Sequence, residues 1–305
     1  MTLTHRGLAR LMPLFGELND AKRIRVAGRR DSLATRWFRQ AWARLIHGEA
    51  LPKVAAETTA RAVAAARLGP IDAAVLAAGG LSAAEVQTVL ERSFDAGGAA
   101  LDEAQTTYLR PALASQSKEA SEDGSAFVHL LTQQPRAGAT HPTRPRVVLE
   151  PAEMHSDHCA VVAVYGVLAA ARYDAEPGPV FLAGLAHHLH NAWLPDAGFA
   201  GDMLLGDMLP PLMERFREQA IQELPTALHA PVRQALALVF RADTPEARAF
   251  QTADVVDRVL EMRWHAQNAA FTLDVALDEM EIVHEGPVQR FQQQVMREVG
   301  LVRAE

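Results

Sequence analysis

Apolar residues recur every three to four positions along most of the chain, which is the spacing of a helix with one buried face. The clearest stripe, within residues 32–47, consists of Leu33, Trp37, Ala41 and Leu45. Alternating β-branched runs are scarce, and no Asn-Gly turn lies between such runs. The pattern therefore predicts an all-α protein.

Start and stop signals place the individual helices. Pro52 suits the first turn of a helix that runs to about Arg67, and Ser82 with Glu85 forms a capping-box pattern that starts another. The Pro- and Arg-rich stretch at 135–151 is expected to be irregular. Further helices are predicted at about 101–114, 127–132, 152–172, 181–194, 206–222, 230–241, 245–268 and 287–300.

A polar, non-periodic segment at 116–125 is the best linker in the chain. It predicts two domains: a smaller helical domain at 1–115, whose role the sequence does not indicate, and a helical domain at 126–305.

Composition excludes several classes of protein. The chain has 305 residues, of which 49% are hydrophobic and 22% charged, so it can bury a core. Its single cysteine, Cys159, cannot form an internal disulfide or a cysteine-based zinc site, which fits a reducing compartment. No apolar run reaches the roughly 18 residues that cross a bilayer, and the first residues do not form a secretory signal. We expect a cytoplasmic protein with no membrane partner.

The net charge of −7 hides an asymmetry, because residues 1–67 carry 13 basic and 5 acidic residues. This basic block could meet nucleic acid or an acidic partner, or its helices could dock on the acidic remainder of the chain. The basic residues are not interleaved with base-stacking aromatics, so the sequence favours docking over nucleic-acid binding. The sequence is also compatible with a homo-oligomer.

Histidines are concentrated in the middle of the chain. Spacing of three residues puts two imidazoles on one helix face, and an unpaired imidazole is costly to bury in apolar surroundings. Hydrogen bonding or metal ligation would satisfy them, and five histidines followed by a helical aspartate favour metal. The five are His155, His158, His187, His188 and His190.

That aspartate is Asp254, which borders the apolar stripe of the helix at 245–268. An acid at the edge of a core face needs a cation, so Asp254 is expected either to bind metal or to pair with Arg258 or Arg144. Asp257, one turn on, is expected within reach of Arg258 or Glu261.

Residues 125–270 resemble the HD-domain superfamily of metal-dependent phosphohydrolases, and within it the 5'-deoxynucleotidase-like branch. The likeness lies in four motifs, which are Pro135-Arg136-Ala137-Gly138 after an apolar helix, Ser156-Asp157-His158, the doublet His187-His188 and Ala253-Asp254. The resemblance implies an HD-like helical bundle. It also implies His158, His187 and Asp254 as metal ligands and Arg136 as a phosphate-binding residue.

Four positions depart from the family pattern. His188 stands where the family has aspartate, Asn191 where it has a catalytic glutamate, and Ala139 where it has an aromatic residue. The aspartate that follows the second helix has a counterpart in Asp196, but Pro195 precedes it where glycine is usual.

The substitution at 188 would leave His158, His187, His188 and Asp254 as ligands. Such a set suits Mn, Co, Zn, Ni or Fe and disfavours Mg²⁺. Asn191 cannot accept a proton, so His190, Asp196 or His155 would have to handle it. Arg144 could complete a guanidinium fork on the phosphate with Arg136, or serve only as a tether.

We therefore expect a metal-dependent phosphohydrolase acting on a nucleotide or another small phosphate ester. One alternative is a degenerate domain that binds a ligand or partner without turnover, which the missing acids at 188 and 191 favour. Another is an HD-type iron oxygenase, which the nitrogen-rich ligand set favours.

Overall fold

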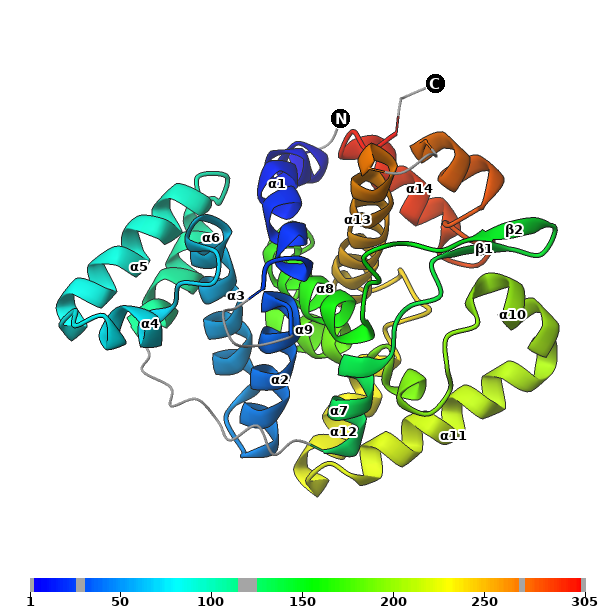
Figure 1. Ribbon diagram of the computed structural model, residues 1–305, viewed down its shortest axis with the longest axis horizontal. Helices are drawn as coiled ribbons and strands as arrows, with labels where there is room; N and C mark the ends of the chain where they lie inside the picture. The colour runs from blue at the N-terminus through cyan, green and yellow to red at the C-terminus, as the bar shows by residue number, and fades with distance from the viewer. Residues whose placement is uncertain (1–2, 26–30, 115–124, 269–271, 303–305) are drawn as a thin grey trace.

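The computed structural model describes residues 3–25, 31–114, 125–268 and 272–302. These residues form an all-α fold with one two-stranded antiparallel sheet, which confirms the predicted fold class (Figure 1). None of the described helices is long and apolar enough to cross a bilayer. In chain order, with η for short 3₁₀ or π segments, the elements are α1 (Leu3–Asn19), η1 (Asp20–Lys22), α2 (Leu33–Ile46), α3 (Leu51–Leu68), α4 (Ala73–Ala78), α5 (Ala83–Gly97), α6 (Glu103–Leu109), η2 (Arg110–Ala114), α7 (Ala126–Gln133), β1 (Ala139–His141), β2 (Arg144–Val147), α8 (His155–Ala170), α9 (Pro177–Ala186), η3 (Leu189–Ala192), α10 (Gly198–Leu205), η4 (Gly206–Met208), α11 (Leu209–Gln222), α12 (Thr226–Leu236), α13 (Pro245–Asn268), η5 (Val275–Glu279) and α14 (Gln289–Glu298).

Helix α8 is the centre of the molecule, and all 16 of its residues are buried. It packs against α9, α13, α2 and α3, as its central position in Figure 1 shows. Close packing with α9 depends on small residues, because a Cβ on Gly184 would lie only 2.4 Å from the Cα of Ala163. The histidines that begin α8 therefore lie inside the protein.

The helices of the first half share this core. Phe15 of α1, Trp42 of α2 and Val63 of α3 belong to one hydrophobic cluster with α8, α9 and α13. Most of the predicted linker lies outside the described residues. The division into two domains stays a prediction, although the described helices on both sides of the linker contribute to one core.

The structure corrects two local predictions. The stretch at 135–151 contains a small hairpin, in which Ala139 pairs with Val147 and His141 with Arg144. Its strands are too short to show an alternating pattern. The helix expected at 181–194 ends at Ala186 and gives way to the 3₁₀ segment η3. Helices α1, α4 and α10 were not predicted.

Candidate metal centre

Three histidines from two elements converge at the centre of the fold. His158 lies in the first turn of α8, and His187 and His188 follow α9. A ring nitrogen from each lies within 4.8 Å of the others, and the Nε2 atoms of His158 and His187 are 3.0 Å apart. Adjacent residues of a helix point in different directions, so the doublet converges only because His188 leaves the helical conformation, with φ −104° and ψ 18°.

Asp254 of α13 adjoins two of these three histidines. Its Oδ1 atom lies 3.3 Å from His158 Nε2 and 3.9 Å from His187 Nε2. Its other oxygen pairs with Arg258 at 3.2 Å, so the carboxylate faces the histidines and an arginine at once. Burial favours protonation, but the charge of Arg258 and the contact with His158 hold the pKa of Asp254 well below its usual range.

Oxygen acceptors orient the rings of the first two histidines. His158 Nδ1 lies 2.6 Å from an oxygen of Asp257, and His187 Nδ1 lies 2.8 Å from the carbonyl of Gly184. An acceptor at Nδ1 keeps the proton on that nitrogen, which leaves Nε2 with a free lone pair. The two Nε2 atoms that face each other are therefore both free to bind a cation.

His188 is held in the same way. Its Nδ1 lies 2.7 Å from Oδ1 of Asn191, whose amide nitrogen donates to the carbonyl of Leu194 at 3.1 Å. That second bond fixes which end of the amide faces His188. Asn191, which sequence reasoning treated only as a missing base, thus positions one of the histidines.

Burial keeps the imidazoles of His187 and His188 neutral. It lowers the pKa of His187 to about 3, helped by repulsion from His158. Burial also lowers the pKa of His188 well below its usual value, and a second proton among these neighbouring histidines would be repelled. Neutral imidazole is the form that binds metal.

Asp257 is a site residue that the sequence reasoning did not find. It is fully buried and contacts His158, Lys22 and Asn19, and it shares the Lys22 ammonium with Glu261, one of its expected neighbours. Asp257 lies on the inward face of α13, one turn beyond Asp254, and this position could have identified it as a site residue.

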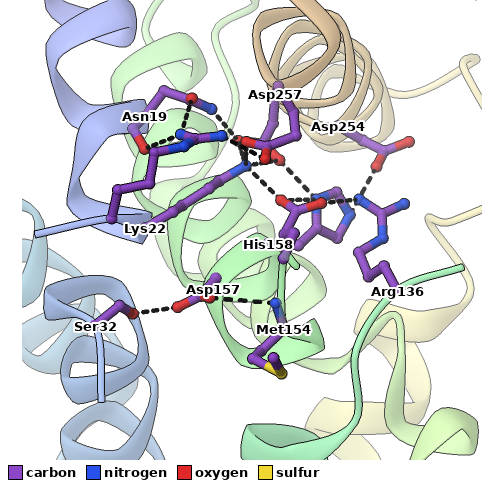
Figure 2. Close-up of polar contacts among 12 residues, drawn as sticks. Asn19, Lys22, Ser32, Arg136, Met154, Asp157, His158, Asp254 and Asp257 are labelled. Carbon is purple, nitrogen blue, oxygen red and sulfur yellow. Dashed lines mark hydrogen bonds and ion pairs between the residues drawn. The ribbon is translucent and has the colours of Figure 1, made fainter. Parts of the chain in front are cut away.

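Lys22 brings a cation from the N-terminal half into the site (Figure 2). Its ammonium group is buried among three carboxylates, at 2.5 Å from Glu153, 2.7 Å from Asp257 and 3.3 Å from Glu261. Arg23 also pairs with Glu261. The basic N-terminal block thus docks in part on acids of the second half.

The N-terminal half also fixes the start of α8. The Asp157 carboxylate accepts hydrogen bonds from the hydroxyls of Ser32 and Thr35 and from the backbone N–H of Met154. Burial nevertheless raises the pKa of Asp157 to about 6. The ring of His158, one residue on, is therefore held from both halves of the chain.

A cavity of about 390 Å³ lies against the cluster and is lined by His187, His188 and Asp254. Arg136 lines it too, but its guanidinium already pairs with Glu153 at 3.0 Å. Arg144 is not among the lining residues and instead lies 3.5 Å from Glu279.

The predicted proton-handling residues, His190 and Asp196, also line the cavity. The Asp196 carboxylate accepts hydrogen bonds from the backbone N–H groups of Ala137 and Gly198, both at 2.9 Å. His155 lies behind them, fully buried, and neither of its ring nitrogens has a hydrogen-bond partner among the described residues. Its Nε2 is 3.8 Å from Asp196.

Comparison with known proteins adds no relative: no family model, curated protein or solved structure matches the chain. The likeness to HD-domain phosphohydrolases therefore stays a prediction.

Proposed function

We propose that this protein is a metal-dependent phosphohydrolase with His158, His187, His188 and Asp254 as metal ligands. One observation supports it most strongly. Each histidine has an oxygen at Nδ1, so its Nε2 is left free, and two of these nitrogens are only 3.0 Å apart. Two facing lone pairs repel each other unless a proton or a metal ion binds them, and burial disfavours a proton on His187.

The donor set fits a transition metal. Three neutral nitrogens and one carboxylate suit Zn, Mn, Fe, Co or Ni better than Mg²⁺, which prefers oxygen ligands. Such an ion, when bound, would polarise a phosphoryl oxygen and lower the pKa of a coordinated water.

The charges around the cluster favour an anionic substrate. Four of the carboxylates near it are each paired with a lysine or arginine. A bound dication would therefore add positive charge that these four acids do not balance, and a phosphate group could help to balance it. The paired groups are Glu153, Asp254, Asp257 and Glu261 with Lys22, Arg23, Arg136 and Arg258.

The chain's own residues offer a route for the proton. Asp196 has a carboxylate on the cavity wall, whereas burial and the nearby Arg217 guanidinium lower the pKa of His190 to about 3. Asp196 is therefore the favoured base, and Asn191 is excluded because its amide holds His188.

The position of Lys22 argues against two-metal oxygen chemistry. Glu153, His158 and Asp257 form a second group with metal-binding potential, on the other side of the His158 ring. The Lys22 ammonium contacts both carboxylates of that group. A tethered cation thus fills the region where a second ion would bind, which favours a single-metal hydrolytic site over a di-iron oxygenase.

The first test is metal content by plasma mass spectrometry on untagged protein purified without chelators. We expect close to one equivalent of a transition metal in the wild type, and loss of it in His187→Ala and Asp254→Ala. His129→Ala is the matched control, because His129 is exposed and its ring contacts the amide of Gln133.

Turnover is then tested on metal-loaded protein with p-nitrophenyl phosphate and nucleoside monophosphates. Unchanged metal content in His187→Ala and Asp254→Ala would refute the ligand assignment. Stoichiometric metal without hydrolysis of any phosphate ester would instead favour the binding-module alternative.

A further inference from the structure

Arg217 is an arginine of the cavity wall that lacks a counter-ion. It lies on α11, and its Nε and Nη2 atoms are buried without a hydrogen-bond partner. No ion pair joins it to another described residue, although the exposed Glu214, one turn earlier, is near enough to oppose the lowering of the Arg217 pKa by burial. The guanidinium carbon lies 5.7 Å from the ring centroid of Phe240.

The other two arginines of the same wall differ in this respect. Arg136 pairs with Glu153, and Arg258 pairs with Asp254 and also donates to the carbonyl of Ile282 at 3.1 Å. An unpaired guanidinium that is partly withdrawn from water is costly, so its persistence at a cavity wall indicates that something anionic binds it.

His190 provides a second unused polar atom in the same corner. It lies on η3, against which α11 packs, and it lines the cavity. Its Nδ1 atom is buried and has no hydrogen-bond partner among the described residues. His190 follows the ligand His188 by two positions, so this corner adjoins the metal cluster.

We propose that Arg217 and His190 form an oxyanion-binding site, which holds the phosphate group of the substrate at the metal centre. The proposal rests on the proposed function and names the residue that recognises the phosphate. It replaces Arg136 and Arg144 in that role, because Arg136 is neutralised by Glu153 and Arg144 lies outside the cavity wall. The ligand class is a tetrahedral oxyanion, which a guanidinium fork and a ring N–H both suit.

The test is titration calorimetry of inorganic phosphate into metal-free, full-length protein. Arg217→Met removes the guanidinium, Arg217→Lys keeps the charge without the fork, and Arg215→Met is the control on the exposed face of the same helix. We expect Arg217→Met to weaken phosphate binding by about tenfold to a hundredfold. Arg217→Lys should lie in between, and Arg215→Met should match the wild type.

Thermal unfolding keeps the result interpretable. Removing an unpaired, partly buried charge should leave Arg217→Met at least as stable as the wild type, whereas phosphate should raise the melting temperatures of the wild type and of Arg215→Met more than that of Arg217→Met. In metal-loaded protein, Arg217→Met should keep its metal and raise KM for a phosphate ester by the same factor.

Two results would overturn the proposal. One is no binding of inorganic phosphate to the wild type at millimolar concentration. The other is equal weakening by Arg217→Met and Arg215→Met, which would indicate general attraction to basic surface. The titration uses metal-free protein, so its result does not depend on metal binding. Absence of metal binding would refute the proposed function, whereas the phosphate titration alone decides this proposal.

Discussion

Replacing Lys22 with methionine should lower the free energy of unfolding by about 3–5 kcal/mol at neutral pH. Lys22 is 3% exposed, and its ammonium lies between 2.5 and 3.3 Å from Glu153, Asp257 and Glu261. Methionine matches the volume of the side chain but leaves three acids without their shared cation. A typical protein has a free energy of unfolding of about 5–15 kcal/mol, so this loss would be a large fraction of the total.

The effect should also depend on pH in a defined direction. Burial favours the protonated form of Asp257 and Glu261, but Lys22 and their hydrogen bonds hold the pKa of each below its ordinary value. Such groups add stability above the unfolded-state pKa and lose it as the pH falls. The difference between wild type and Lys22→Met should therefore be greatest near pH 7 and should shrink below the ordinary glutamate pKa of 4.5.

Urea unfolding at pH 7 and pH 4 measures both quantities. Lys53→Met is the control, because Lys53 has a side chain that is 51% exposed and pairs with Glu49 at the surface. We expect that control to cost less than about 1 kcal/mol. A loss below about 1 kcal/mol in Lys22→Met, or one that is the same at both pH values, would refute this account of the buried charges.

Two further substitutions test the supports of the site. Asn191→Ala should weaken metal binding about tenfold to a hundredfold, because it releases His188. Asn191→Asp keeps the hydrogen-bond acceptor and should retain the wild-type affinity. Competition with a chromophoric chelator measures both, and equal metal affinities of the two variants would contradict the orienting role of Asn191. Gly184→Ala should destabilise the protein by about 1–3 kcal/mol in urea, because its Cβ would lie 2.4 Å from the Ala163 Cα. Gly16→Ala, a control helix position with nothing within 4 Å, should be neutral or stabilising.

Local patterns predicted much of the helical framework. The stripe beginning at Leu33 lies on α2 (Leu33–Ile46), and the capping box of Ser82 and Glu85 starts α5 (Ala83–Gly97) with both of its hydrogen bonds. These features depend on neighbours within one turn, so the chain displays them directly. The hairpin at 139–147 was missed because strands of three and four residues carry no recognisable period.

Part of the candidate site was also visible in the sequence. Asp254 was expected to contact either a metal or an arginine, and its two oxygens face the histidines and Arg258 respectively. Spacing suggested that His187 and His190 share a helix face, but the helix ends before them and His187 meets His158 instead. A break in a helix changes the direction of every later side chain, and the apolar pattern did not indicate the break after Ala186.

The sequence by itself determined that the chain is helical, that histidines are buried and that an acid borders the core face of a late helix. Only the tertiary structure decided which groups meet, because Lys22, His158 and Asp257 are each separated by about a hundred residues or more. Helical periodicity specifies which face of a helix is buried, but not its partner or its register against that partner. The contacts that leave the histidine nitrogens free and Arg217 without a counter-ion arise from packing between distant helices.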